Sequence, residues 1–181
     1  ANRATAKALV PANDNLGATW TGSPSFEPFD TTGWLSGPTG VGYDRATAYD
    51  SLIGVDVGRQ MRSNTSVYIR IDFDVSDPAL VDLLELRIKY DDGFVAFLNG
   101  EQLVSANSPA SPGWNSSARV AHGANPRAYI KFDVSDKKGK LRTGRNVLAI
   151  QGLNDTVNSS DMLIVPELYA GKVSAPTTLE P

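Results

Sequence analysis

The most constraining stretch of the sequence is Lys89–Val104, where two tight-turn sequences interrupt runs of apolar and aromatic residues. Asn99-Gly100 suits a two-residue type I′ turn, because both central positions of that turn need a positive φ, which Asn and Gly tolerate best. Asp91-Asp92-Gly93 also has the composition of a turn. The stretch therefore predicts a β-meander, three short antiparallel strands joined by two tight turns.

Other runs have the periodicity of strands. In residues 67–74 every second residue is Val, Ile or Phe and the residues between them are Tyr, Arg or Asp, which predicts a half-buried strand. Residues 84–90 repeat this alternation. Residues 94–98 and 147–151 are apolar on both faces or nearly so, which predicts strands that are covered on both sides.

The composition of the whole chain is typical of an all-β fold. Its 16 Gly and 11 Pro are spread among short runs rich in Val, Ile, Phe and Tyr. We predict a two-sheet antiparallel β-sandwich, a jelly roll, with at most one or two short helical turns at residues 78–83, after Asp77-Pro78. Residues 1–172 are predicted to form a single sandwich module. Residues 173–181 have the composition of a linker, which suggests a module cut from a longer protein.

Composition and charge exclude several classes of function. Cys is absent, which excludes thiol catalysis, Cys-based metal sites and disulfides. The 17 basic and 20 acidic residues give a net charge of −3 without a basic stripe, so we expect no nucleic-acid partner. No apolar run approaches the ~20 residues of a membrane span, so we expect no membrane partner. The start of the chain lacks a signal-peptide layout, which indicates a trimmed mature piece or a cytosolic chain. We expect a monomer.

Aromatic residues in turn-rich segments are candidates for ligand binding. Trp20 and Trp34 lie in the segment 11–42, whose aromatic residues either pack over the sandwich as a lid or form an exposed binding surface. Trp34 is interpreted as a core residue. Trp114, between Pro-Gly and Asn-Ser-Ser, is the main candidate for an exposed platform that stacks on a sugar ring. Tyr43 is a further candidate for ligand binding.

Three motifs, in order, resemble the galactose-binding-domain-like β-sandwich that occurs in carbohydrate-binding modules and in jelly-roll accessory domains of bacterial hydrolases. Phe29–Gly37 with Gly42-Tyr43 is similar to the "FD-x-x-x-W-x-x-G … GY" motif of that family. Leu86–Val104 is similar to its "LR-x-x-DD-x-x-x-x-x-NG-x-x-V" hairpin. Phe132–Ser135 and Leu141–Gly152 are similar to its closing strands. The resemblance implies a jelly-roll fold, a tendency toward glycan binding and an extracellular or cell-surface location, but no site that transfers residue by residue.

The Asp91-Asp92 pair is the most pointed polar feature. Two adjacent carboxylates suit Ca²⁺, which takes oxygen ligands, and they also accept hydrogen bonds from sugar hydroxyls. The pair resembles the acidic pair that some calcium-dependent adhesin sandwiches use. The alternative is that Asp91 caps the turn and Asp92 is solvated. Asn154 either lines a polar pocket or satisfies the backbone of its own loop.

Catalysis has little support in the sequence. His122 is the only histidine and no G-x-S-x-G elbow occurs, which argues against a Ser-His-Asp hydrolase. Glycoside hydrolysis by two carboxylates is left open, because the sequence does not give their separation. We therefore expect a non-catalytic carbohydrate-binding module. It would target a polysaccharide for a larger parent protein and contact neighbouring domains of that protein. Its predicted ligand-binding residues are Trp114, Trp20, Tyr43, Asp91, Asp92 and Asn154, with Ca²⁺ at Asp91 and Asp92. The alternative is a structural or protein-interaction domain of a multidomain extracellular enzyme.

Overall fold

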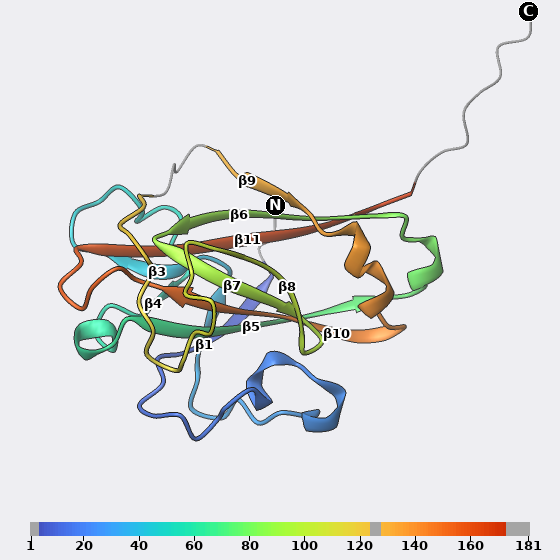
Figure 1. Ribbon diagram of the computed structural model, residues 1–181, viewed down its shortest axis with the longest axis horizontal. Coiled ribbons are helices and arrows are strands. Elements are labelled where there is room, and N and C mark those ends of the chain that lie inside the picture. Colours follow the sequence, from blue (N-terminus) through green and yellow to red (C-terminus); the bar gives the residue numbers. More distant parts are fainter. Residues whose placement is uncertain (1–3, 124–127, 173–181) are drawn as a thin grey trace, which may run out of the picture.

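The computed structural model describes residues 4–123 and 128–172, and within these residues two β-sheets pack face to face (Figure 1). One sheet has six strands in the order β2-β1-β5-β10-β7-β8. Their bounds are β1 Thr5–Leu9, β2 Leu35–Pro38, β5 Ser66–Val75, β7 Gly93–Leu98, β8 Glu101–Ala106 and β10 Gly144–Leu153. The predicted tail, 173–181, lies outside the described residues.

The second sheet has five strands in the described part of the chain, in the order β4-β3-β11-β6-β9. They are β3 Val41–Asp44, β4 Val55–Asp56, β6 Leu83–Asp91, β9 Ile130–Asp133 and β11 Asp161–Gly171. The pairings are antiparallel apart from the short parallel pair β3–β4. The predicted two-sheet sandwich is therefore confirmed.

Helical structure in the described residues consists of short 3₁₀ segments: η1 Thr19–Thr21, η2 Pro24–Phe26, η3 Met61–Ser63, η4 Pro78–Leu80 and η5 Ser135–Lys140. The predicted turn at Pro78 is η4. The side chain of Asp77 caps it, since Asp77 Oδ1 accepts a hydrogen bond of 2.9 Å from the Ala79 amide.

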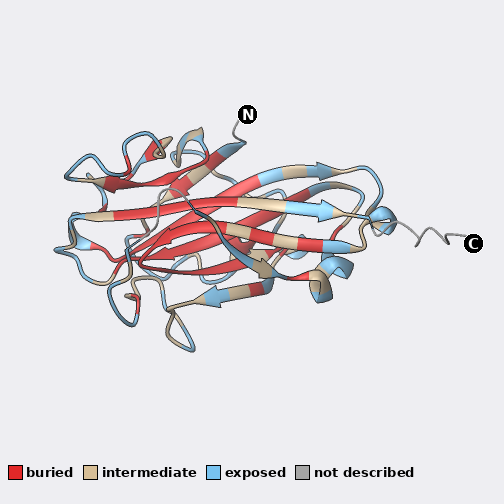
Figure 2. Ribbon diagram, turned by 90° about the horizontal axis from the view of Figure 1, so that it is seen from above, coloured by how far each residue is buried: buried red, intermediate tan, exposed pale blue. Residues whose placement is uncertain are grey.

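The core lies between the sheets, and the strand centres are buried while several strand ends are exposed (Figure 2). The predicted alternation of residues 84–90 is confirmed, because Leu84, Leu86 and Ile88 are fully buried in this core. The predicted covered strands are also confirmed, because residues 147–151 of β10 are buried, as are residues 94–98 of β7 apart from the half-buried Phe97. β1 is not an edge strand, because it pairs with β2 on one side and β5 on the other.

The predicted β-meander is confirmed for one of its two turns. Asn99-Gly100 forms the predicted tight turn between β7 and β8, with φ values of 51° and 90°. In contrast, Asp91-Asp92-Gly93 is no hairpin turn, because β6 belongs to the five-stranded sheet and β7 to the six-stranded sheet. The amide of Asp92 donates instead to the Leu153 carbonyl over 3.1 Å, and the peptide bond between Asp91 and Asp92 is cis. The chain therefore crosses from one sheet to the other at this pair.

A second apolar cluster lies on the outer face of the six-stranded sheet. The segment 10–34 covers part of this face (Figure 1), and Trp20 packs there against Tyr68, Val147 and Ala149. Phe29 and Trp34 pack against the same cluster. Trp34 was predicted to be a core residue, but it is half-buried and lies outside the space between the sheets. The segment thus forms a lid over a sheet face.

Candidate functional site

A groove of about 370 Å³ crosses the outer face of the six-stranded sheet. Its floor consists of side chains from adjacent strands. Gln151 of β10 pairs in register with Tyr68 of β5 and with Val95 of β7. In the next row, Phe97 of β7 pairs with Gln102 of β8. The full lining is Asp14, Gly17, Ala18, Trp20, Thr21, Tyr68, Val95, Phe97, Gly100, Gln102, Ala110, Ser111, Pro112, Gly113, Trp114 and Gln151. This volume and mixed lining fit the ~300–1,000 Å³ range of small-ligand sites.

The segment that carries Trp20 forms one wall. The Trp20 ring stacks on Tyr68 with centroids 4.0 Å apart and meets Phe97 edge to face at 5.9 Å. Arg70, which is 2% exposed, holds this wall to the sheet, since its Nη1 donates to the Trp20 carbonyl over 2.6 Å. Its Nη2 donates to Glu27 Oε1 over 2.6 Å. Trp20 itself is only 2% exposed, so it supports the groove and is no free stacking platform.

The loop that carries Trp114 forms another wall. Hydrogen bonds fix this loop to the sheet on both sides of the tryptophan. Gln151 Nε2 donates to the Gly113 carbonyl over 2.8 Å, Ser66 Oγ donates to the Ser116 carbonyl over 2.8 Å, and the Thr65 amide donates to Asn115 Oδ1 over 2.7 Å. Trp114 is therefore half-buried on a pre-organised loop, which lowers the entropy cost of binding a ligand.

Gln151 has one polar atom left for a ligand. Its Nε2 donates to Gly113 and to Ser66 Oγ at 3.0 Å, which fixes the orientation of the amide. The side chain is 4% exposed and lines the groove, and its Oε1 has no protein partner within the described residues. An amide oxygen without a protein partner is an acceptor that a ligand hydroxyl can satisfy.

The groove carries little charge. Asp14 is the only Asp, Glu, Lys, Arg or His among the described residues that line it. Burial raises the pKa of the Tyr68 hydroxyl to about 12, and the negative charge of Asp14 acts in the same direction. Tyr68 is therefore a neutral hydroxyl over the physiological range of pH.

Four of the predicted ligand-binding residues lie elsewhere, in a network at the crossover between the sheets. Asp91 and Asp92 are 3% and 4% exposed, so the alternative that Asp92 is solvated was wrong. Asp91 Oδ2 accepts a hydrogen bond of 2.7 Å from the Tyr49 hydroxyl. Asp92 Oδ1 accepts one of 2.6 Å from the His122 amide, and its Oδ2 accepts one of 2.7 Å from the Asp155 amide. The two aspartates thus bond to three loops, those that carry Tyr49, His122 and Asp155.

Tyr43 and Asn154 belong to the same network. The buried Asn154 Nδ2 donates to the Tyr43 hydroxyl over 2.8 Å, and that hydroxyl donates to the Ser159 carbonyl over 3.1 Å. Asn154 Oδ1 accepts from the Asp155 amide at 3.0 Å. Asn154 therefore bonds the backbone of its own loop through Oδ1, as one of its two interpretations proposed, while its Nδ2 bonds the side chain of Tyr43.

Burial raises the pKa of Asp92, and the negative charge of Asp155 contributes to that rise. The backbone hydrogen bonds from His122 and Asp155 oppose it. Asp155 Oδ1 and His122 Nδ1 are buried and have no hydrogen-bond partner within residues 4–123 and 128–172. In that part of the chain, no three His, Asp or Glu side chains gather as a group that could hold a metal ion.

The structure thus separates the predicted residues into two places. Trp114 and Trp20 line the groove, whereas Tyr43, Asp91, Asp92 and Asn154 lie in the crossover network. The sequence patterns did not identify Tyr68, Phe97, Gln102 or Gln151 as groove residues. The sequence does contain one indication of Gln151, because this polar residue stands at the end of the apolar run 147–150.

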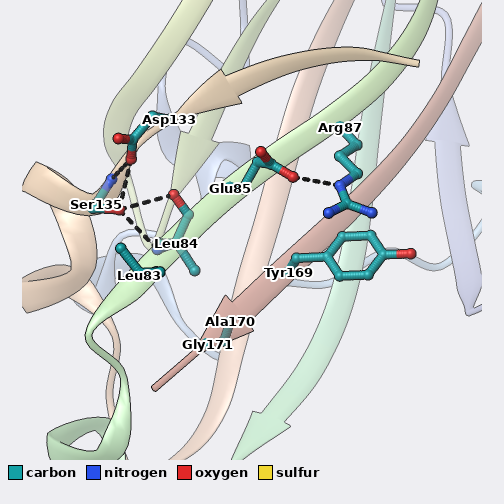
Figure 3. A pocket seen from close by; sticks show the side chains of 9 residues that line it. All are labelled: Leu83, Leu84, Glu85, Arg87, Asp133, Ser135, Tyr169, Ala170 and Gly171. Carbon is teal, nitrogen blue, oxygen red and sulfur yellow. Dashed lines mark hydrogen bonds and ion pairs between the residues drawn. The ribbon is translucent and has the colours of Figure 1, made fainter. Parts of the chain in front are cut away.

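A second hollow, of about 390 Å³, lies where β6 begins and β11 ends (Figure 3). Its aromatic residue is Tyr169, whose ring is covered by the Arg87 guanidinium at 3.7 Å from the centroid. Arg87 also pairs with Glu85, and Ser135 Oγ donates to Asp133 Oδ1 over 2.6 Å. Since the ring face is occupied and the charged groups are paired, this hollow is a weaker candidate for sugar stacking.

Comparison with known proteins identifies the fold. No family model and no curated protein sequence matches the chain. Among solved structures, a Bacteroides uniformis β-glucuronidase matches with 12% identity and a TM-score of 0.50, covering 90% of this chain and 17% of that one. A B. uniformis β-glucuronidase 2, covalently bound to cyclophellitol-6-carboxylate aziridine, matches with 12% identity and a TM-score of 0.50, covering 91% and 17%. The chain therefore has the fold of a β-sandwich that makes up a small part of these glycosidases. In the described residues, no helix is long and apolar enough to span a membrane.

Proposed function

We propose that the chain is a non-catalytic carbohydrate-binding module, an accessory domain that holds a larger, extracellular or cell-surface protein on a polysaccharide. The observation that carries this proposal is the groove, which is lined by Trp114 on a fixed loop and by Gln151, whose Oε1 has no protein partner among the described residues. Trp114 would stack on the apolar face of a sugar ring, and the amide oxygen would accept a hydrogen bond from a hydroxyl. Binding at a single site of this size would be weak and would be strengthened by tethering to the parent protein.

The absence of catalysis is part of the proposal. Glycoside hydrolysis by the common mechanisms needs two carboxyl groups on either side of the scissile bond. Among the described groove residues, Asp14 alone carries a carboxylate. Release of reducing ends from a polysaccharide that the module binds, at a rate lost in Asp14→Asn, would contradict this part of the proposal.

The test is affinity electrophoresis against a panel of soluble polysaccharides. Trp114→Ala should weaken retention by at least ~10-fold, or about 1.4 kcal/mol, since central aromatic residues dominate binding energy. Trp34→Ala is the matched control, because Trp34 is half-buried against the same apolar cluster but does not line the groove. Equal losses in the two variants would contradict the assignment of the groove. Retention by no polysaccharide would favour a structural or protein-interaction domain, for which the exposed Leu83 and Tyr169 at the second hollow offer a contact surface.

Calcium binding at Asp91 and Asp92 stays a prediction. Carboxylate oxygens suit Ca²⁺, and the unpartnered Asp155 Oδ1 lies in the same network. Both oxygens of Asp92, however, already accept backbone hydrogen bonds. If calcium binds, excess Ca²⁺ should raise the melting temperature of the wild type but not that of Asp92→Asn. The same melting temperature in Ca²⁺ and in chelator would contradict the prediction.

A further inference from the structure

We propose that the groove selects neutral glycans and rejects polymers whose sugars carry carboxylates. The inference rests on the proposed function and names the class of ligand for that same groove. It depends on the charge and hydrogen-bond character of the residues that line the groove.

The charge of the groove lining favours neutral ligands. Recognition of a carboxylate normally uses Arg, Lys or clustered backbone amides, and Arg is preferred because it pairs with both oxygens. The described lining holds no basic side chain, and its single charged group is the carboxylate of Asp14. The buried Arg70 beneath the wall is already bonded to Trp20 and Glu27. An ionised sugar in the groove would therefore meet a like charge and no cation.

The hydrogen-bonding groups of the groove floor also favour ligands that carry hydroxyls. Both N–H groups of Gln151 are used within the protein, so Oε1 is the atom left for a ligand. This oxygen can only accept. A sugar hydroxyl can donate to it, whereas an ionised carboxylate can only accept and would leave both groups unsatisfied.

The Asp14 charge also acts on the groove floor. Asp14 lines the same groove as Tyr68, and its charge contributes to the raised pKa of that hydroxyl. The neutral Tyr68 hydroxyl therefore adds no charge to the floor. The wall and the floor thus both favour uncharged hydroxyl-rich ligands.

The test compares two forms of one polymer. A neutral polysaccharide that the wild type retains is oxidised selectively at C6, which converts hydroxymethyl groups to carboxylates without changing the linkages. Affinity for the oxidised polymer should fall at least ~10-fold, and the loss should be smaller at high salt. Asp14→Asn should reduce the discrimination, and Gln102→Lys, at an exposed position of the lining, should reduce it further.

Basic residues elsewhere need a control. Arg45, Arg59 and Arg62 line a separate hollow of about 320 Å³ and are exposed. The comparison is therefore repeated in the Arg59→Ser/Arg62→Ser variant, in which adsorption of polyanions at that hollow is weakened. The discrimination against the oxidised polymer should be the same or larger.

The outcomes separate the two proposals. If the oxidised polymer binds this variant as tightly as the neutral one, and Trp114→Ala abolishes both, the groove binds glycans but neutral selectivity is wrong. If only native polyuronates such as alginate or polygalacturonate are retained through Trp114, neutral selectivity is again wrong. If no polysaccharide of either kind is retained, both the proposed function and this inference fail.

Discussion

The side-chain amide of Gln151 donates a hydrogen bond to the backbone carbonyl of Gly113, with a separation of 2.8 Å. This contact joins the centre of the six-stranded sheet to the loop that carries Trp114. It makes the position of the aromatic platform depend on a strand residue.

Gln151→Met should loosen the Trp114 loop without unfolding the protein. The change removes donors to the part-buried Gly113 carbonyl and the buried Ser66 hydroxyl, which should cost about 1–3 kcal/mol of stability because both acceptors lose this partner. Hydrogen exchange in residues 113–117 should become faster, and retention by a bound polysaccharide should fall. Unchanged exchange in this loop would show that the contact does not hold it.

Arg70→Met should destabilise the fold by about 2–3 kcal/mol, measured by chemical denaturation, because the Trp20 carbonyl and Glu27 lose a buried donor. Arg145→Met is the matched control. Arg145 is about half exposed and pairs with Glu27 and Asp72, so its loss should cost at most ~1 kcal/mol. Similar costs for the two variants would contradict the role of Arg70 as the residue that holds the lid to the sheet.

Gly100→Ala should cost more stability than Gly33→Ala. Both glycines have positive φ values, 90° and 83°, where Ala is strained by about 1 kcal/mol. A Cβ at Gly33 would meet nothing within 4 Å, whereas one at Gly100 would lie 2.6 Å from Ser23 Cβ. The extra cost at Gly100, about 1–3 kcal/mol, measures the contact between the β7–β8 turn and the lid. Equal melting temperatures for the two variants would mean that this contact is absent in solution.

Asp92→Asn should change the pH dependence of stability. The pKa of Asp92 is raised above its ordinary value of 3.8, so the folded protein holds more protons than the unfolded chain between these two pKa values. The contribution of Asp92 to stability therefore falls as the pH rises from below 3.8 through the folded pKa. The asparagine side chain of the variant does not titrate and has one acceptor oxygen instead of two, so the variant should be less stable overall.

The deficit of Asp92→Asn relative to the wild type should be largest below pH 3.8 and should shrink as the pH rises through this window. Denaturation of both proteins at a series of pH values measures the difference directly. Taking the difference cancels the effects of other carboxylates, including Asp30 and Asp133, whose pKa values are lowered by hydrogen bonds from Thr32 and Ser135. A deficit that grows with rising pH would contradict the raised pKa.

Much of the fold could be predicted because local periodicity reports burial between the sheets. The alternation in residues 84–90 and the Asn99-Gly100 turn are local signals, and both are confirmed. The crossover at Asp91-Asp92 could not be predicted, because a turn sequence does not say whether the next strand joins the same sheet. Which sheet the next strand joins depends on groups distant in the sequence, such as the Leu153 carbonyl, which accepts a hydrogen bond from the Asp92 amide.

The candidate site was predictable only in part, for a related reason. The alternation in residues 67–74 assigned Tyr68 and Arg70 to the face away from the core, which is correct. It did not show that a segment some 50 residues earlier buries both of them, because that covering is a tertiary contact. Trp114 was identified as a candidate from its turn-rich surroundings, but Gln151, which bonds the neighbouring Gly113 carbonyl, is close to this loop only in the folded chain.

The floor of the groove is built from adjacent strands, so the spacing of its side chains is set by the backbone. Tyr68, Gln151 and Val95 follow one another across β5, β10 and β7 at steps of ~4.8 Å, the distance between hydrogen-bonded strands. Substitutions on the groove floor therefore change the chemical groups that face a ligand but not the spacing of the backbone positions that carry them. Evolution toward a sugar polymer with a different repeat would therefore act on the loops at either side, whose lengths are free to vary.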